Sequence, residues 1–353
     1  MQPSLSLLAG PDALRILRER GLRAEDVDVV PGASGGPKWL VLAALDRFLF
    51  GEFLQVPRAR PLDLIGSSIG SWRLACLALK DPAAALDRAH AGYIEQRYPH
   101  KPSAQLVTET SVRLLDTLLS PTGRDEILAH PWARLHVLTT LCRGPFGSER
   151  RSLQMAGLAL AAAGNLATRR ALAFQTKRVI FHAAGRESPF RDLSDFPTMH
   201  VPLTAENVGP ALMASASIPL VLSGVRVPGA PDGVFRDGGV IDYHLDLDFG
   251  PGEGLVLFPH FYPHMVPGWF DKALRWRRAR PANFRRALVL CPSTEFVARL
   301  PGRKIPDRKD FVNLSDGERI AAWNEVVRAS AELASELGEL LASGRIADHV
   351  RPL

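Results

Sequence analysis

The sequence predicts an α/β fold with a mainly parallel central sheet, because two units of strand, glycine-rich loop and helix follow each other near its start. Each unit combines a short apolar run with a tight loop and a stretch of helical periodicity. The predicted elements are a strand at 27–30, a loop at 31–36 and a helix at 39–50, then a strand at 62–65, a turn at 66–70 and a helix at 71–79. Two such units in succession are typical of parallel strands covered by helices.

Further apolar runs add strands and helices to this sheet. The expected strands lie at 135–139, 178–182, 255–258 and 287–291, and the expected helices at 12–21, 153–173 and 320–341. Ser315, followed three residues later by Glu318, resembles a capping box and indicates a C-terminal helix at about 316–343. Because no Pro/Gly/Ser-rich linker interrupts the chain, we expect one domain over 1–353, with its motif-bearing core at about 27–300.

The composition is typical of a packed globular protein, with 353 residues of which 46% are hydrophobic and 23% charged. Cys76, Cys142 and Cys291 are widely spaced and lack any metal-ligand pattern, so we expect reduced, buried thiols. The N-terminus has no basic region before its brief apolar run, and no apolar stretch approaches the roughly 20 residues that span a bilayer. These features favour a cytoplasmic protein.

The turn Gly66-Ser67-Ser68-Ile69-Gly70 fits the G-x-S-x-G nucleophile elbow, which holds a serine on a sharp bend between strand and helix. Side chains at Gly66 or Gly70 would crowd this bend, and the dipole of the following helix would stabilise an anion formed at Ser68. Ser68 is therefore the candidate nucleophile. A plainer alternative is that Ser68, or equally Ser67, only caps the helix.

Two other glycine-rich segments can complete an acyl-transfer site. Gly35 and Gly36 lie just over thirty residues before the candidate nucleophile and are candidate backbone donors to an oxyanion. Their loop matches neither the P-loop nor the dinucleotide fingerprint, so we do not expect a nucleotide there. Asp237 is followed by two glycines, a pattern that alone most often marks a turn. Between elbow and aspartate, the small residues of 214–219 allow close approach of another backbone.

In this order, the four segments resemble the patatin-like phospholipase family. The family pattern is a G-G-x-[KR] loop, a G-x-S-x-G elbow, an A-S-x-x-x-P segment and a late D-G-[GA]. The matching segments of this chain are Gly35 to Lys38, Gly66 to Gly70, Ala214 to Pro219 and Asp237 to Gly239. The resemblance covers about residues 27–242, and the shared order is far more specific than any single motif.

The resemblance implies a three-layer α/β/α fold and a Ser/Asp dyad, without a catalytic histidine or a cofactor, that hydrolyses acyl esters of lipids. Asp237 would then take the proton of Ser68, an acyl-enzyme would form, and Asp237 would activate the water that releases the fatty acid. The N–H groups of Gly35 and Gly36 would hold the oxyanion.

Three positions depart from the family pattern. Ser34 and Trp39 stand where the loop often has glycine, and Ser71 stands where a second glycine often follows the elbow. The bulk of Trp39 calls the width of the acyl entrance into question.

The order of residues also allows a Ser-Asp-His triad of the α/β-hydrolase kind, with His244, His260 or His264 as its third member. A dyad needs no histidine, and each of the three imidazoles has another role available. We therefore favour the dyad and keep the triad as the alternative.

The sequence contains residue types that can bind metal, although we predict no metal site. Four of them alternate with apolar or aromatic residues: Asp242, His244, Asp246 and Asp248. Strict alternation is equally typical of a strand with one solvated face, which is the interpretation we favour. His260 and His264 have the zinc spacing of a helix, but Pro263 lies between them and the metalloprotease glutamate is missing.

The net charge of +6 is concentrated in one segment. Seven cationic residues with no acid between them lie at Lys272, Arg275, Arg277, Arg278, Arg280, Arg285 and Arg286. We expect an amphipathic helix that begins after Pro267-Gly268. Its candidate membrane contacts are Trp269, Phe270, Lys272, Arg275 and Arg278.

Such a helix suits an anionic lipid surface and a peripheral location at the membrane. The alternative is a solvated helix whose aromatic face packs on the core. Nucleic acid is not an expected partner, because no known nucleic-acid-binding motif accompanies the charge. A second hypothesis for the whole chain is a non-catalytic protein that docks on lipid or granule surfaces through residues 269–286.

Overall fold

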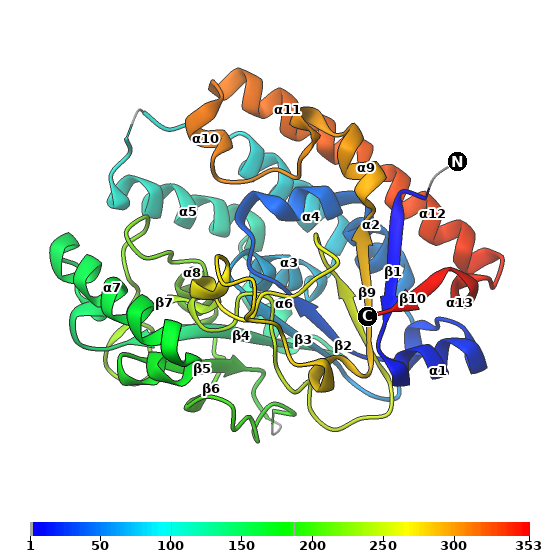
Figure 1. The fold of residues 1–353 in the computed structure, drawn as a ribbon, viewed down its shortest axis with the longest axis horizontal. Coiled ribbons are helices and arrows are strands. Elements are labelled where there is room, and N and C mark those ends of the chain that lie inside the picture. The colour runs from blue at the N-terminus through cyan, green and yellow to red at the C-terminus, as the bar shows by residue number, and fades with distance from the viewer. Residues whose placement is uncertain (1–2, 100, 186–187) are drawn as a thin grey trace.

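The computed structural model describes residues 3–99, 101–185 and 188–353, which form one ten-stranded mixed sheet with helices around it (Figure 1). The strands are β1 Leu5–Ala9, β2 Val27–Gly32, β3 Leu62–Ser67, β4 Ala133–Cys142, β5 Thr176–His182, β6 Thr198–Pro202, β7 Val234–Asp237, β8 Leu255–Pro259, β9 Ala287–Pro292 and β10 Val350–Pro352. The six strands predicted from apolar runs are all present. The strands β1, β6, β7 and β10 were not predicted.

Neighbouring strands run mostly parallel, which confirms the predicted fold class. The order along the sheet is β10-β1-β9-β8-β2-β3-β4-β5-β6, and β7 also pairs with β4. Among the strands of the described residues, only the pairs β1 with β9, β4 with β5 and β4 with β7 are antiparallel. The central strands β8 and β9 are buried along their whole length, as expected for strands with apolar contacts on both faces.

The long strand β4 determines where the functional segments meet. Its first half pairs with β3, where Ser67 lies opposite Leu138. Its second half pairs with β7, where Asp237 lies opposite Thr139. Because Leu138 and Thr139 are consecutive, the carboxyl ends of β3 and β7 point at each other along the same edge of β4.

The helices are α1 Pro11–Arg20, α2 Ala43–Phe48, α3 Ile69–Leu77, α4 Pro82–Ile94, α5 Ala104–Leu119, α6 Gly123–Ala129, α7 Arg151–Ala167, α8 Val208–Ser215, α9 Thr294–Arg299, α10 Asp310–Asn313, α11 Asp316–Ala329, α12 Ala331–Ala342 and α13 Ile346–His349. Figure 1 shows α7 beyond β5 and β6 at one end of the molecule, with α1 and α13 at the other. Within the described residues, no helix is long and apolar enough to cross a membrane.

Three predicted helices differ from the observed ones. The helix expected at 39–50 begins as a 3-10 turn over Gly36–Leu42 and is α-helical only in α2. The helix expected at 153–173 ends at Ala167, because Thr168 is extended and starts a separate 3-10 turn.

The single C-terminal helix expected at about 316–343 is two helices, α11 and α12, which meet at Ser330. The Ser330 hydroxyl donates to Val327 O at 2.6 Å and accepts from Ala44 N at 3.0 Å, so a fixed contact with α2 marks the junction. The predicted capping box of Ser315 and Glu318 is confirmed at the start of α11.

A buried ion pair joins the two strand, loop and helix units. Arg73 on α3 donates to both carboxylate oxygens of Asp46 on α2, each at 2.7 Å, and both side chains are inaccessible to solvent. Removal of one partner would leave an uncompensated buried charge, which costs several kcal/mol, roughly 3–5. The pair therefore fixes the elbow helix relative to the helix that follows the glycine loop.

The prediction for the three cysteines is confirmed. Cys76, Cys142 and Cys291 are free and buried, and burial raises the pKa of each thiol to about 12. They are therefore protonated core residues.

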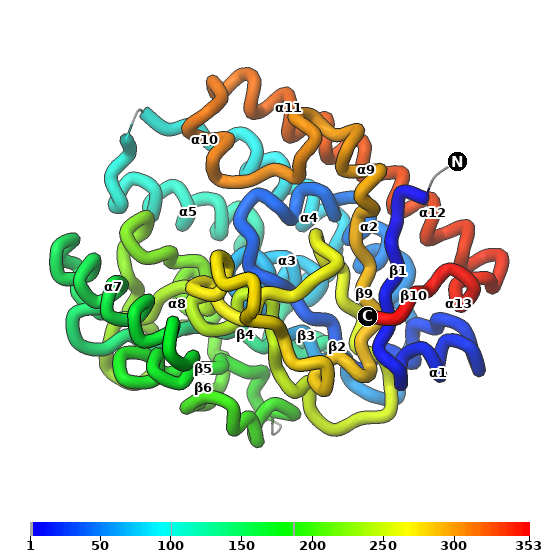
Figure 2. The backbone as a smooth tube through the Cα atoms, viewed as in Figure 1, coloured from blue at the N-terminus to red at the C-terminus, as the bar shows by residue number. Residues whose placement is uncertain are grey.

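Figure 2 shows the first and last strands side by side, where β1 pairs in parallel with β10.

Candidate active site

Ser68 occupies the bend between β3 and α3 with φ 57° and ψ −133°. Non-glycine residues rarely adopt positive φ, and such strained conformations concentrate at functional sites. A Cβ added at Gly66 would lie 2.5 Å from the Cα of Ser71, and one added at Gly70 would lie 2.0 Å from the carbonyl oxygen of Gly32. The backbone packing of the elbow therefore requires glycine at both predicted positions.

The Ser68 hydroxyl donates a hydrogen bond to Oδ2 of Asp237 at 2.7 Å. Both residues are nearly inaccessible, with 2% of Ser68 and 6% of Asp237 exposed. The Ser68 side chain makes no capping hydrogen bond to α3, and the Ser67 hydroxyl accepts instead from Ser34 at 2.9 Å. Neither serine thus serves as the helix cap that was the plainer alternative.

Backbone contacts on three sides hold Asp237 in place. Its Oδ1 accepts from the N–H of Gly239 at 2.7 Å, which leaves Oδ2 directed at the serine. Its carbonyl oxygen accepts from the hydroxyl of Thr140 at 3.0 Å, and its N–H donates to the carbonyl of Ser217 at 3.0 Å. The carboxylate is therefore oriented before any substrate binds.

The segment Ala214–Pro219 connects the two halves of this pair. The Ser215 hydroxyl accepts from the N–H of Ser68 at 2.9 Å and donates to the carbonyl of Leu138 at 2.7 Å. Two residues further on, the carbonyl of Ser217 binds the N–H of Asp237. The predicted close approach of this segment to other backbone is thus observed on both the serine and the aspartate.

Burial raises the pKa of the Asp237 carboxyl above its usual value. The charge of Arg308, the hydrogen bond from Ser68, the N–H of Gly239 and the charge of Lys272 oppose this shift. A carboxylate with a raised pKa is a stronger proton acceptor than an ordinary aspartate, which is the property that a general base needs.

The loop that contains Gly35 and Gly36 packs directly on the elbow. The Ser34 hydroxyl donates to the hydroxyl of Ser67, and the backbones of Gly32 and Gly70 touch. In the part of the chain that the structure describes, neither Gly35 nor Gly36 has a hydrogen-bond acceptor for its N–H. Two free amides beside the nucleophile are a suitable arrangement for an oxyanion.

The three departures from the family pattern have defined contacts. Ser34 binds Ser67 as described, and the Ser71 hydroxyl donates to the carbonyl of Ser68 at 2.7 Å. Trp39 is buried, and its ring stacks on that of His90 with the centroids 4.3 Å apart. The bulk of Trp39 is therefore accommodated against α4.

Three cationic side chains surround the glycine loop, and one of them, Arg308, was missed by the sequence analysis. A Cβ added at Gly36 would lie 3.0 Å from Nε of Arg308, so the guanidinium group lies over the loop. Lys38 follows in the same loop, and Lys272 places its ammonium 3.9 Å from the centre of the Tyr243 ring. No carboxylate among the described residues forms an ion pair with any of the three.

These cations are close enough to influence each other. Partial desolvation and the charges of Arg308 and Lys38 lower the pKa of Lys272 to about 7. Burial likewise lowers the pKa of Lys38. Three basic side chains without a direct ion pair make the region around the glycine loop attractive to an anion, and a bound anion would favour the charged form of Lys272.

The histidines do not complete a triad. Within the described residues, no imidazole is hydrogen-bonded to Ser68 or Asp237. His244 and His260 are buried against each other; Nδ1 of His244 accepts from the N–H of Val266 at 3.0 Å, and Nδ1 of His260 lies 2.7 Å from the carbonyl oxygen of Tyr262. Burial lowers the pKa of His260 to about 3, so this ring stays neutral. His264 is exposed.

The strand expected over 242–248 is absent, and its solvated face was a wrong prediction. This segment is irregular, and Asp242, His244 and Asp246 are buried while Asp248 is exposed. Asp242 accepts from Arg178 at 2.7 Å and Asp246 accepts from the N–H of Arg280 at 3.0 Å. No group of three or more His, Cys, Asp or Glu residues that could hold a metal ion occurs among residues 3–99, 101–185 and 188–353.

The predicted basic amphipathic helix is also absent. Only Trp269–Asp271 is helical, as one 3-10 turn, and the chain then continues irregularly to a second turn at Pro281–Phe284. Trp269 and Phe270 are half-buried and pack on an apolar cluster that includes Phe146. The aromatic side therefore packs on the core, which was the stated alternative.

Several arginines of this segment have individual acidic partners. Arg277 lies 3.8 Å from Asp271, Arg280 lies 3.5 Å from Asp195, Arg285 lies 2.8 Å from Asp12, and Arg286 lies 3.5 Å from Asp28. These acids lie on separate elements, so the basic side chains contact several parts of the fold. Arg275 and Arg278 are exposed.

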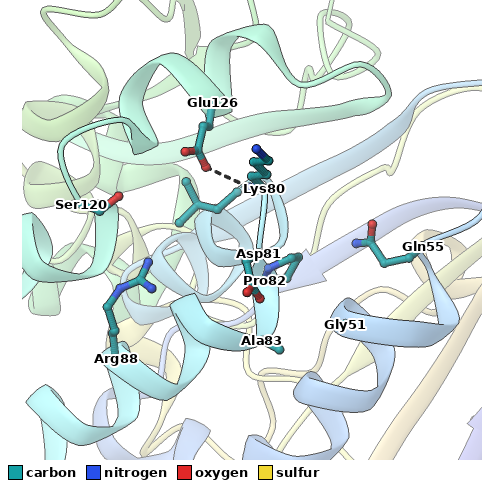
Figure 3. Close-up of a pocket in the computed structure, with 10 residues that line it drawn as sticks. Gly51, Gln55, Lys80, Asp81, Pro82, Ala83, Arg88, Ser120 and Glu126 are labelled. Atoms are coloured by element: carbon teal, nitrogen blue, oxygen red, sulfur yellow. Dashed lines mark hydrogen bonds between the residues drawn. The ribbon is translucent and has the colours of Figure 1, made fainter.

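Two cavities of the structure lie away from the candidate nucleophile. Figure 3 shows a cavity of about 570 Å³ lined by Lys80, Asp81, Arg88, Ser120 and Glu126, among others. Another, of about 550 Å³, is lined by Lys272 and several arginines of the basic segment. Neither of these two cavities is lined by Ser68 or Asp237, which are 2% and 6% exposed.

Comparisons of the chain with family models, with curated proteins and with solved structures found no match. The function is therefore argued from the geometry of the site.

Proposed function

We propose that this protein is a serine hydrolase that cleaves lipid acyl esters through a Ser68/Asp237 dyad. The observation that carries the proposal is the 2.7 Å hydrogen bond between the strained, buried serine and a carboxylate whose pKa is raised. A nucleophile next to an oriented base is the arrangement expected for covalent catalysis. A patatin-like, three-layer α/β/α architecture belongs to the same proposal, and the parallel sheet with the elbow at the end of β3 supports it.

In the proposed reaction, Ser68 Oγ attacks the ester carbonyl while Asp237 Oδ2 accepts the hydroxyl proton. The N–H groups of Gly35 and Gly36 then hold the negative oxygen of the tetrahedral intermediate. When the intermediate collapses, the ester C–O bond breaks and the proton passes from Asp237 to the leaving alcohol. Asp237 next deprotonates a water molecule that attacks the acyl-serine, and collapse of that intermediate returns the proton to Ser68.

The cations around the glycine loop favour one class of ester. Lys38, Lys272 and Arg308 lie beside the oxyanion donors without acidic partners. An acyl ester with a nearby phosphate would neutralise them, whereas a neutral glyceride would leave their charge uncompensated. We therefore expect phospholipase or lysophospholipase activity to exceed activity on neutral carboxylic esters.

A fluorophosphonate probe tests the proposed nucleophile. We expect labelling of the wild type and none of Ser68→Ala, while Ser335→Ala, an exposed serine on α12, serves as the matched control and labels normally. Loss of p-nitrophenyl ester turnover in Ser68→Ala and Asp237→Asn is the second expected result. Normal labelling of Ser68→Ala would contradict the proposal, and loss of turnover in His244→Ala alone would favour a triad.

A second candidate is a non-catalytic protein of this fold that binds lipid surfaces. The closed position of Ser68, only 2% exposed, favours this candidate. It predicts vesicle binding that Ser68→Ala and Asp237→Asn leave unchanged, together with no ester turnover at any pH. Turnover that Asp237→Asn abolishes would exclude it.

A further inference from the structure

The helix α7 exposes an apolar face to solvent. Its 17 residues, Arg151–Ala167, carry one charge, at the first position. At about 100° per residue, the exposed positions from Ser152 onward cover an arc of roughly 160° on one side of the helix. The residues on this arc, apart from Ser152, are Leu153, Met155, Ala156, Ala159, Leu160, Ala163, Leu166 and Ala167. A surface helix of a globular protein normally has polar residues on this side.

Exposed apolar side chains are concentrated around this helix. Among the described residues, eleven large hydrophobic side chains are exposed, and five of them lie between positions 153 and 174. Leu160 is 60% exposed, and Phe174, on the 3-10 turn that packs on α7, is 87% exposed. Trp276, 68% exposed, precedes Arg277 in the sequence, and Arg277 donates to the carbonyl of Asn165 on α7 at 2.7 Å. Contiguous patches of this kind mark interaction sites.

Arginines without acidic partners border the apolar face. From 143 to 176 the sequence contains five arginines and a single glutamate, and that glutamate pairs with Arg236. Four of these arginines are exposed and form no ion pair in the described part of the chain: Arg143, Arg150, Arg151 and Arg170. Arg143 lies beside the Phe174 turn, where its N–H donates to the carbonyl of Gln175 at 2.8 Å. Arg275 and Arg278 flank Trp276.

The inner face of α7 is attached to segments that border the candidate active site. The Gln154 side chain accepts from the N–H of Leu220 at 2.8 Å, one residue after the segment that binds Ser68 N–H. Asn165 donates to Asp271 at 2.7 Å, next to Lys272. The outer face therefore belongs to an element held firmly beside the dyad.

We infer that this outer face, with Phe174, Trp276 and the arginines around it, docks the protein on a bilayer that contains anionic lipid. Apolar side chains would enter the region between headgroups and acyl chains while the arginines contact lipid phosphates, and the helix would lie in the plane of the interface. The excess of positive charge selects an anionic lipid surface over a second copy of the chain, because two such faces would repel each other. Docking does not require the hydrolase activity.

Vesicle sedimentation tests the inference, with vesicles of phosphatidylcholine alone and of an equal mixture with phosphatidylglycerol. The wild type should bind the mixed vesicles, and salt should weaken the binding. The triple variant Leu160→Ser/Leu166→Ser/Phe174→Ser should bind about tenfold more weakly or worse, because its apolar contacts are gone. Val312→Ser, at an exposed apolar site 83% accessible on α10, is the matched control and should bind like the wild type.

A second variant, Arg150→Gln/Arg151→Gln/Arg170→Gln, should lose most of the preference for anionic vesicles. Equal vesicle binding by the wild type and the apolar triple variant would overturn the inference. So would a wild-type dimer that the triple variant converts to a monomer, because a second copy would then occupy the face. Turnover of a water-soluble p-nitrophenyl ester, measured on the same proteins, separates the two proposals. A wild type that binds mixed vesicles but does not hydrolyse the ester would refute the proposed hydrolase and leave the docking inference standing.

Discussion

Ser68 and Asp237 lie 169 positions apart in the chain, yet their side chains share a 2.7 Å hydrogen bond. The contact follows from the register of β4, where β3 ends opposite Leu138 and β7 ends opposite Thr139. Two strands that arrive from opposite directions thus deliver the serine and the carboxylate to one point. The geometry of the pair is a property of the sheet, and the loops around it add orientation.

Ser215 is expected to act as a positioning residue, because its hydroxyl joins the N–H of Ser68 to the carbonyl of Leu138. Ser215→Ala should lower kcat about tenfold with little change in KM, since the serine loses its orientation but the binding surface stays. The two buried backbone groups lose their partner, so the free energy of unfolding should fall by about 1–3 kcal/mol. Steady-state kinetics and urea denaturation measure both effects. An unchanged kcat would contradict the positioning role.

Asp237→Asn should lower kcat and raise the free energy of unfolding at neutral pH. Loss of a general base typically lowers kcat by about 10²–10⁴-fold. In the wild type, burial raises the pKa of Asp237 in the native state above its pKa in the unfolded state. As the pH rises, the carboxyl therefore ionises first in the unfolded state. The free energy of unfolding falls between the two pKa values and stays lower above them. The asparagine variant lacks this loss and should be more stable at neutral pH, by about 1.4 kcal/mol for each unit of the shift.

Thermal unfolding of wild type and Asp237→Asn from acid to neutral pH measures this difference. The two curves should approach each other below the ordinary aspartate pKa, where the carboxyl is protonated in both states. The activity of the wild type should fall as the pH drops through the raised pKa, because only the carboxylate accepts the serine proton. A stability difference that is the same at every pH would contradict burial as the cause.

Arg308 should contribute to the binding of anionic esters. Its guanidinium lies over Gly36, beside the proposed oxyanion donors. Arg308→Gln is expected to raise KM for a lysophospholipid about tenfold, and to change KM for a neutral p-nitrophenyl ester by less than about threefold. Arg308→Lys should restore part of the preference because it keeps the charge. Equal effects on both substrates would indicate a structural role.

Gly70→Ala should destabilise the protein, because the added Cβ would lie 2.0 Å from the carbonyl oxygen of Gly32. The glycine loop would have to separate from the elbow, and we expect a loss of about 2 kcal/mol or more together with a large fall in kcat. The matched control is Gly317→Ala in α11, where a Cβ meets no neighbour and where alanine should stabilise the helix by about 0.5–1 kcal/mol. Chemical denaturation compares the two.

Site residues could be predicted from the sequence where the motif that marks them lies within a few consecutive positions. The elbow needs glycine at 66 and 70 within a single turn, so its spacing can be recognised without a structure. Asp237 could be singled out only through the order of motifs, since β7 has four residues and shows no periodicity. Arg308 carries no local signal, because the side chain reaches the glycine loop through tertiary packing.

Helical periodicity in the basic segment was misleading for a related reason. The spacing of Lys272, Arg275 and Arg278 matches a helix, but Arg285 and Arg286 bind acids on α1 and β2, far away in sequence. Tertiary ion pairs of this kind override local preference. The sequence of 151–167 is almost entirely apolar or small. Only the structure shows which side of this helix packs on the protein and which side is exposed to solvent.

The division of β4 between two partners has a consequence for biosynthesis. A nascent chain that has emerged from the ribosome as far as Cys142 already contains β2, β3 and β4. The glycine loop follows β2 in this segment, and the elbow follows β3. The second half of β4 has no partner on this edge until β7 is synthesised, and β7 begins 92 residues after Cys142. Because Ser215 and Asp237 both follow this segment in the chain, neither the support of the Ser68 N–H nor the base exists at that stage. The proposed enzyme would thus stay inert during synthesis until Asp237 docks on the strand that already supports Ser68.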